Sequence, residues 1–282
     1  MAAKLRQLRR RIRNIHHIRQ IAKAMYTIAM SQVILRKREL LGARPFSDEA
    51  LRILSDLASW AKMNFVTHPL LDGNGKPGVG LLVVNADRGL CGRYVDDVNR
   101  AASEFLRQKG EAKLILVGDK AIRYFRRGSW PIVRTYRRLE RPNLSHARQI
   151  AKDILDLYTE VGELHAVYTE FRGELLQKVR VERLLPIPVV LGTPRETLVE
   201  PDIPFLLGEL GELWLLGRVY RLLLEAKTSE HAARRQAMKA ATDNADELLE
   251  KLTIQYNKAR QQRITFELMD IMGGAEAIRE EL

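Results

Sequence analysis

Apolar residues near the N-terminus recur at alternating steps of three and four. The resulting seam comprises Leu5, Leu8, Ile12, Ile15, Arg19, Ala22, Tyr26, Ala29, Val33, Arg36 and Leu40. Only the two arginines interrupt it. A repeat of 3.5 residues predicts a helix that winds around a partner in a left-handed supercoil. We therefore predict an N-terminal coiled-coil helix over residues 1–65.

The C-terminal stretch has the composition of a second long helix. Residues 229–272 contain no proline and no glycine and are rich in good helix formers. One stripe follows steps of four and three, through Ala237, Ala241, Ala245, Leu248, Leu252, Gln255 and Ala259. Its residues are small, so a partner helix can approach closely. About 60 residues at a rise of about 1.5 Å each would form a rod of about 90 Å, which needs a companion.

The two terminal helices are predicted to pair with each other. Because a large block of chain separates them, the simplest connection makes the pair antiparallel. The C-terminal helix is the longer, so it should project past the first residue and end near the glycine pair at Gly273. Its tip carries Leu268, Ile271 and Met272. An exposed apolar tip of this kind predicts that a partner surrounds it.

The block between the helices alternates strand-like and helix-like segments. Apolar runs predict strands at 79–84, 114–117 and 165–171, and the segments between them predict helices at 94–109, 119–127 and 144–159. This alternation is typical of a layered α/β domain with a largely parallel sheet. Residues 178–185 alternate valine with charge, which favours an antiparallel edge strand. The predicted fold class is α/β, a long antiparallel two-helix coiled coil plus a central α/β domain, with boundaries at 1–65, 66–203 and 204–282.

The N-terminal helix carries most of the chain's excess positive charge. The chain has a net charge of +12, and residues 1–44 hold twelve Lys and Arg against the single acid Glu39. Apolar residues also surround the helix from Ile15 to Ile34, more than one coiled-coil stripe can bury. The charge predicts an acidic protein partner. The additional apolar residues predict a further contact, either with a surrounding partner or with the chain's own globular domain. A DNA-reading basic region would lie outside its zipper, whereas here the seam runs through the basic residues.

Candidate chemistry is sparse. The segment Ala86–Gly92 follows a predicted strand but lacks the GxGxxG and GxxxxGK[ST] spacings that cradle phosphates. Cys91 is the only cysteine, and His16 and His17 point about 100° apart on a helix, too far for a ready metal pair. We therefore predict a noncatalytic chain that binds no cofactor and no metal. No apolar run is long enough to span a membrane, and no secretory signal is present.

Three ordered motifs carry a family resemblance. QIAKAMYTIAMSQ near the N-terminus, NADRGLCG in the middle, and SEHAARRQAMKAATDNA, YNKARQQRIT and ELMDIMGGAEAI near the C-terminus resemble the γ subunit of bacterial F-type ATP synthase. The resemblance implies a Rossmann-like central domain and a rotor shaft inside a ring of three α and three β subunits, driven by proton flow through a membrane ring. It also implies partners in the ε subunit and the c-ring, and a peripheral location on the cytoplasmic face of the bacterial plasma membrane, with no membrane insertion and no nucleic acid.

The same resemblance implies contact residues on the rod. Met25, Arg260 and Gln261 match positions where the family's shaft meets loops of the β subunits, and Gln262 and Thr265 lie within one turn of them. Setting the first residue opposite Ile264 places Arg234 and Arg235 at the level of Met25, where they could face the same acidic loops of the surrounding β subunits.

Two other functions remain open on the sequence. A basic coiled coil that binds nucleic acid predicts salt-sensitive binding. An α/β enzyme with helical oligomerisation arms predicts a ligand at the carboxyl edge of the sheet.

Overall fold

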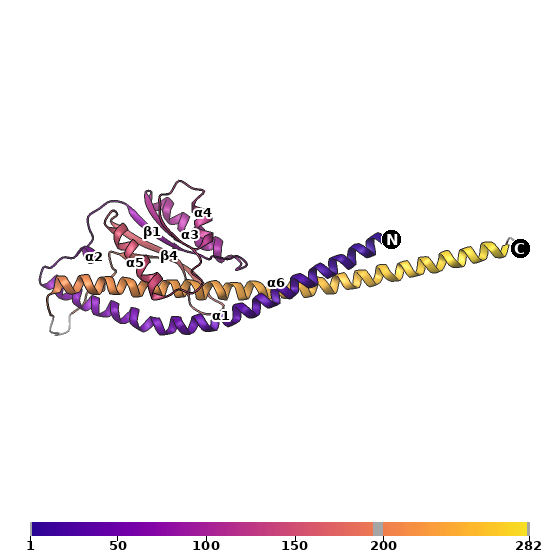
Figure 1. The fold of residues 1–282 in the computed structure, drawn as a ribbon, viewed down its shortest axis with the longest axis horizontal. Helices are drawn as coiled ribbons and strands as arrows, with labels where there is room; N and C mark the ends of the chain where they lie inside the picture. The colour runs from indigo at the N-terminus through magenta and orange to yellow at the C-terminus, as the bar shows by residue number, and fades with distance from the viewer. Residues whose placement is uncertain (1, 194–199, 281–282) are drawn as a thin grey trace. The chain divides into compact units, whose positions relative to one another are not determined.

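Two long helices formed by the ends of the chain dominate the computed structural model (Figure 1). The structure describes residues 2–193 and 200–280, with side chains for 3–193 and 200–273. Helix α1 spans Ala2–Met63 and helix α6 spans Ile203–Glu280. Contacts divide the chain into two units, each drawing on both helices. We call Met1–Ile28 with Arg235–Leu282 the coiled-coil unit, and Ala29–Arg234 the globular unit.

The helices run through residues that could have ended them. Pro45 lies inside α1, and Gly42 meets no neighbouring atom that a side chain would displace. The prediction that α6 ends near Gly273 is wrong, because the helix continues to Glu280. A glycine in an exposed helix costs only about 1 kcal/mol relative to alanine, and the good helix formers that follow offset that cost.

The coiled-coil unit pairs the two helices antiparallel, as predicted. Arg19 of α1 forms an ion pair with Asp246 of α6. The α1 seam is buried or half-buried at Leu5, Leu8, Ile12, Ile15, Arg19, Ala22 and Tyr26. On α6 one row of buried or half-buried residues follows steps of four and three, through Met238, Thr242, Ala245, Leu249, Leu252, Tyr256 and Ala259. Ala237, Ala241 and Leu248 of the predicted stripe are half-buried beside this row. Gln255, predicted in the seam, is exposed, and the larger apolar ring of Tyr256 takes its place.

The same seam continues within the globular unit. Ala29, Val33, Arg36 and Leu40 are each no more than 2% exposed. Val33 and Leu40 pack in one cluster with Leu224 and Ala232 of α6 and with Phe171. The strict heptad read from the N-terminal sequence is thus matched by burial along its whole length.

A five-stranded sheet forms the centre of the globular unit, with strand order β3-β2-β1-β4-β5. The strands are β1 Val79–Val84, β2 Ala112–Val117, β3 Ile132–Tyr136, β4 Glu163–Phe171 and β5 Gln177–Leu185. The shorter helices are α2 Pro69–Asp72, α3 Tyr94–Lys109, α4 Asp119–Phe125 and α5 Leu144–Tyr158. Strand β5 is antiparallel to β4 and the other pairings are parallel, as predicted.

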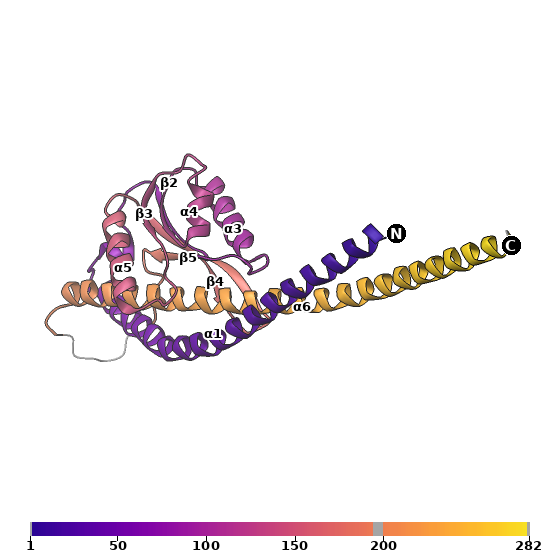
Figure 2. The same cartoon turned by 45° about the vertical axis from the view of Figure 1, so that its right-hand side comes forward.

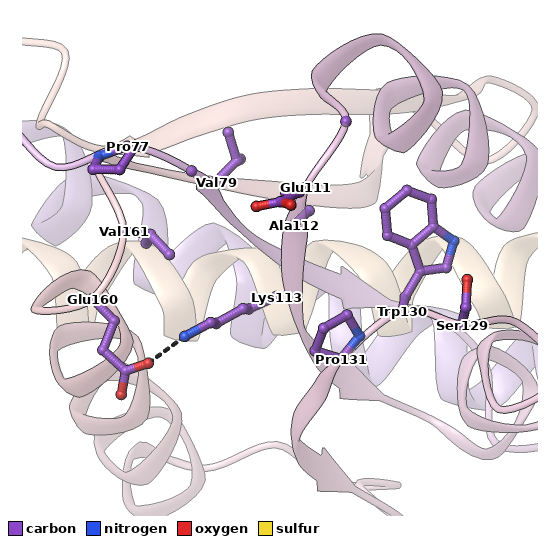
Figure 3. A pocket seen from close by; sticks show the side chains of 12 residues that line it. Pro77, Val79, Glu111, Ala112, Lys113, Ser129, Trp130, Pro131, Glu160 and Val161 are labelled. Atoms are coloured by element: carbon purple, nitrogen blue, oxygen red, sulfur yellow. Dashed lines mark hydrogen bonds and ion pairs between the residues drawn. The ribbon is translucent and has the colours of Figure 1, made fainter.

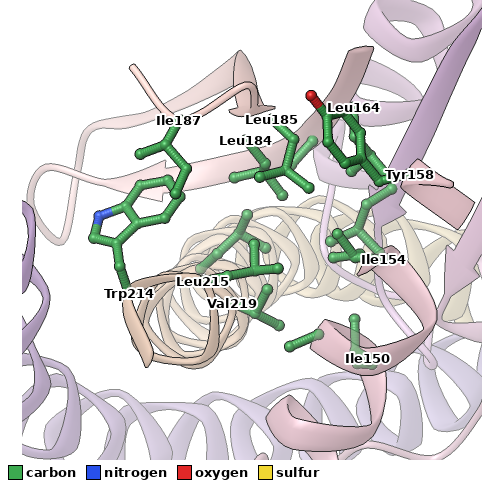
Figure 4. Close-up of a cluster of buried hydrophobic side chains, with 14 of the residues drawn as sticks. Ile150, Ile154, Tyr158, Leu164, Leu184, Leu185, Ile187, Trp214, Leu215 and Val219 are labelled. Carbon is green, nitrogen blue, oxygen red and sulfur yellow. The ribbon is translucent and has the colours of Figure 1, made fainter. Parts of the chain in front are cut away.

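Each face of the sheet is covered by a different set of helices (Figure 2). Leu81 and Val83 of β1 point to one face, where they pack with α3 and α4. Leu82 and Val84 alternate to the other face, where they pack with α5 and α6. In this second core the Trp214 side chain of α6, 1% exposed, lies beside Ile187, which follows β5, whereas Leu215 and Val219 of α6 point toward Ile150 and Ile154 of α5 (Figure 4). The first part of α6, up to Arg234, therefore belongs to the core of the globular unit.

Candidate functional site

The coiled-coil unit places most of the predicted contact residues on its surface. Arg260, Gln261, Gln262 and Thr265 are exposed on α6, in the stretch that follows the seam residue Ala259. The Thr265 hydroxyl donates to the Gln261 carbonyl at 3.0 Å, as a threonine inside a helix commonly does. Met25 is half-buried on α1. These polar side chains are thus available to a partner.

Arg260 also lines a groove of about 580 Å³ between the two helices. Leu5, Tyr256 and Ile264 supply its apolar atoms, and Arg6, Arg9, Arg260 and Arg263 surround them. The one acid in the lining, Glu267, is paired with Arg263 at 2.6 Å. Four guanidinium groups and one carboxylate make the groove suited to an acidic segment. Arg6, Arg9 and Arg263 were not predicted as groove residues from the sequence, although their positions flank the seam.

The tip of α6 is apolar and exposed. Leu268, Ile271 and Met272 are 56%, 69% and 70% exposed. They lie beyond the part of α6 that α1 buries within the coiled-coil unit. No contact of the described residues covers them, so the prediction of a surrounding partner stays a prediction.

A second candidate region lies in the globular unit, where two sequence motifs meet. Asp87, just after β1, accepts hydrogen bonds from the backbone N–H groups of Asp119, at 3.2 Å, and Arg138, at 3.0 Å. Its other carboxylate oxygen lies 3.1 Å from Nζ of Lys227 on α6. One buried carboxylate therefore joins the end of β1, the start of α4, the loop after β3, and α6.

Lys227 extends this contact along α6. Its Nζ lies 2.9 Å from Glu230, whose other oxygen pairs with Arg234 at 2.7 Å. We call Asp87, Lys227, Glu230 and Arg234 the buried ionic cluster, because their side chains are only 4% to 8% exposed. The spacing of three and four that joins these α6 residues is readable in the sequence. The link to Asp87 is not, because the two motifs lie 140 residues apart.

The cluster corrects one predicted contact. Arg234 is 6% exposed, and its guanidinium also donates to the backbone carbonyls of Gly89, at 3.3 Å, and Arg88, at 3.4 Å. It therefore faces the chain's own loop and not a surrounding partner.

The Arg19–Asp246 pair sets the register of the coiled-coil unit, so that Met25 lies nearest the turn around Ala240. Arg235 is half-buried, and its predicted contact with a partner is not tested.

Burial and charge shift the pKa values in and beside the cluster. Burial raises the pKa of the Glu230 carboxyl, but Lys227 and Arg234 outweigh it, so the net shift is downward. Burial likewise lowers the pKa of the Lys227 amine, and Glu230 and Asp87 outweigh it, so the net shift is upward. Both groups are therefore charged at neutral pH. Burial lowers the pKa of His231 to about 4, which keeps this ring neutral.

The NADRGLCG loop is buried at Asn85, Ala86 and Cys91, and exposes Arg88 and Leu90. Cys91 is 2% exposed, and burial raises the pKa of its thiol, which disfavours the reactive thiolate. Gly118, which follows β2, has a φ of +94° and lies against the loop so closely that a Cβ atom would come within 2.2 Å of the Asn85 carbonyl oxygen. The carboxyl edge near β1, where an α/β enzyme would hold its ligand, is filled by the chain itself.

A hollow of about 580 Å³ lies instead at the amino edge of the sheet (Figure 3). Val79, Val161, Pro131 and the Trp130 ring supply apolar walls, and Lys113 pairs with Glu160 at 2.5 Å. Among the residues that the structure describes, no group of three His, Cys, Asp or Glu side chains could hold a metal ion. No helix in the described ranges is long and apolar enough to cross a bilayer.

Comparisons with known proteins agree along the whole chain. The profile of a family described as ATP synthase matches residues 4–278. The ATP synthase gamma chains of Mycobacterium marinum and Mycobacterium tuberculosis are each 38% identical to this chain, over 99% of both sequences. The central stalk and c-ring of Tetrahymena thermophila mitochondrial ATP synthase has a chain with a TM-score of 0.66 and 22% identity, covering 78% of this chain and 99% of that one. A Euglena gracilis mitochondrial ATP synthase rotor chain gives 0.63 and 18%, covering 94% and 100%.

Proposed function

The chain belongs to the family of ATP synthase gamma chains, and from that premise we propose how its two units divide the work of a rotor shaft. As the central rotor shaft of ATP synthase, it couples rotation of the membrane ring to the conformational cycling of the catalytic sites. It is a subunit of the ATPase complex and part of a peripheral assembly at a membrane. The nucleic-acid alternative gains no support from its relatives.

We infer that the coiled-coil unit turns inside the hexamer of α and β subunits. The observation that carries this assignment is the groove of Arg6, Arg9, Arg260 and Arg263, which suits an acidic loop of a β subunit. Gln261, beside Arg260, and Gln262 and Thr265 one turn on extend the polar contact. The apolar tip at Leu268, Ile271 and Met272 turns in a bearing formed by the top of the hexamer.

Coupling requires that this surface bind different conformations of β at different angles, because a partner with equal affinity for two states shifts neither. The coiled-coil unit meets that requirement by its asymmetry. Its four-arginine groove lies at one level of the pair, where α1 and α6 both contribute. One β subunit at a time then meets the cationic groove, while the others meet different sides of the rod.

We assign the contacts with the membrane c-ring and the ε subunit to the globular unit. The buried ionic cluster ties the end of β1 to α6, so torque applied to the sheet passes directly to the axle. ATP chemistry belongs to the partner subunits, and the chain itself holds no catalytic residue and no cofactor. We place it on the cytoplasmic face of a bacterial plasma membrane, with the proton as the coupling ion.

Reconstitution tests this function. The full chain is mixed with α and β subunits from the same source, and ATP hydrolysis is measured for the wild type, for Arg260→Ala and for Lys258→Ala. Lys258 is a matched control because it is exposed on the same helix but does not line the groove. We expect one copy of the chain per hexamer, slower turnover with Arg260→Ala and wild-type turnover with Lys258→Ala. A chain that never enters the hexamer would refute the shaft.

A further inference from the structure

Strand β3 leaves one edge of the sheet open. It is an edge strand with β2 as its one neighbour in the sheet, and Val133, Arg134 and Thr135 are all exposed. The carbonyls of Pro131 and Tyr136 each accept a hydrogen bond from the β2 side at 2.8 Å. A register shift between Leu114 and Ile115 interrupts the alternation between these two carbonyls, so the direction is counted from Tyr136. Because backbone groups alternate along a strand, the N–H and C=O of its neighbour Thr135 point away from β2. Such an edge is a template for one more strand.

This edge is also strongly cationic. Residues 120–152 hold ten Lys and Arg against one acid, Glu140. Arg134 and Arg137 lie 3.5 Å from Asp153 and Asp119, and their side chains are 62% and 48% exposed. Arg138 and Arg141 are exposed and form no ion pair with any side chain in the described ranges. Two copies of this edge would repel each other, whereas an acidic strand is attracted to it.

The apolar hollow at the amino edge of the sheet lies where β3 begins (Figure 3). Trp130 and Pro131 immediately precede the strand and form part of its wall. Val79 and Val161 form another part. A chain running beside β3 therefore has arginines at one end of its path and an apolar recess, large enough for one or two big side chains, at the other.

We propose that the β3 edge docks an extended, acidic segment of a partner protein. Its backbone pairs with Thr135, its carboxylates contact Arg134, Arg137 and Arg138, and an apolar residue at one end enters the hollow beside Trp130. Duplex DNA could satisfy the same arginines, but it has no strand to pair with the open backbone of Thr135. The unpaired edge therefore favours a peptide over a nucleic acid. This surface is separate from the shaft contacts of the coiled-coil unit.

Fluorescence anisotropy on the full chain tests the proposal. The probe is a labelled peptide of about ten residues that alternates glutamate with valine and carries leucines at one end, made with the leucines at either terminus. Two chain variants are compared with the wild type. Thr135→Pro removes the outward N–H, and Arg138→Glu with Arg141→Glu reverses two charges. Arg107→Glu is the control, because Arg107 is exposed on α3 and forms no ion pair with a described side chain.

We expect Thr135→Pro and the double arginine variant each to weaken peptide binding about tenfold or more, and Arg107→Glu to leave it unchanged. The same peptide with N-methyl groups at alternate residues should lose binding to the wild-type chain, a result that does not depend on how Thr135→Pro folds. If N-methylation and Thr135→Pro have no effect, the arginines attract the peptide by charge alone and the strand-docking proposal is overturned. Binding of duplex DNA more tightly than the peptide, insensitive to Thr135→Pro, would overturn it equally.

Discussion

Removal of the Lys227 amine probes how the globular unit is joined to α6. In Lys227→Met the side chain keeps its length but loses its charge, so Asp87 loses the only cation that pairs with it among the described residues. Asp87 retains its two backbone N–H donors, and Glu230 retains Arg234. One buried carboxylate is thus left partly compensated. Breaking a buried pair in this way costs about 3–5 kcal/mol, and the retained hydrogen bonds favour the lower end, about 3 kcal/mol.

Urea unfolding followed by tryptophan fluorescence measures this loss in the right place. The three tryptophans, Trp60, Trp130 and Trp214, all lie in the globular unit. With a slope of about 2 kcal/mol per molar urea, a loss of about 3 kcal/mol lowers the midpoint by about 1.5 M. The slope itself should not change, because the variant exposes no additional surface on unfolding.

Lys109→Met is the matched control in the same unit. Lys109 also pairs with a glutamate, Glu163, at 3.0 Å, but the two side chains are 40% and 39% exposed. Such a surface pair contributes little to stability, because water screens both charges. If Lys227→Met shifts the midpoint no more than Lys109→Met does, the cluster does not join β1 to α6 and our account of torque transfer is wrong.

Three further predictions concern stability. Because the folded pKa of His231 is about 4, acidification from about pH 7.5 to about pH 5 protonates this residue only in the unfolded chain and lowers the free energy of unfolding by about 2 kcal/mol. Urea midpoints should show this loss in the wild type and not in His231→Gln. Equal losses in both proteins would contradict the prediction. Gly118→Ala forces a Cβ to within 2.2 Å of a backbone oxygen and should lower the free energy of unfolding by about 3 kcal/mol or more. Gly110→Ala, at a φ of +76° with no atom within 4 Å, should lower it by about 1 kcal/mol. Similar urea midpoints for the two variants would rule out the clash. Leu252→Ala, at a position 4% exposed in the coiled-coil unit, should lower the free energy of unfolding by about 2–3 kcal/mol. Ile254→Ala, at a position 62% exposed, should lower it by about 0.5 kcal/mol or less. Unfolding followed by far-UV circular dichroism measures both, and the reverse order would refute the seam.

Periodicity carried most of what the sequence could predict. The α1 seam was readable because each of its positions repeats a local rule, and β1 and α3 were predicted with their observed ends because apolar runs and charged faces mark them. Strand β3 was missed, because an exposed edge strand with Arg134 at its centre has no apolar run to reveal it. Gln255 was placed in the α6 seam because the spacing of residues in one helix does not decide which of two neighbouring positions, Gln255 or Tyr256, faces the partner helix.

The candidate site was predictable only where it is local. Arg260 and Gln261 stand in a continuous motif, so a resemblance could locate them, and the structure leaves both exposed. Arg234 stands in an equally clear motif, yet its guanidinium is turned inward by Glu230 and the loop at Gly89. Contacts between residues more than a hundred positions apart follow from the fold, and no spacing in the sequence encodes them.

Direct observation of rotation tests the central claim best. The hexamer of α and β subunits is fixed to a surface, and a bead is attached through Gln108→Cys, an exposed position at the end of α3 in the globular unit. The native Cys91 is 2% exposed and should not compete for the label. We predict that ATP drives the bead in one direction with three pauses per turn, and that Arg260→Ala changes the pauses. A bead that only fluctuates about one position, while the chain stays bound and ATP is hydrolysed, would contradict the account.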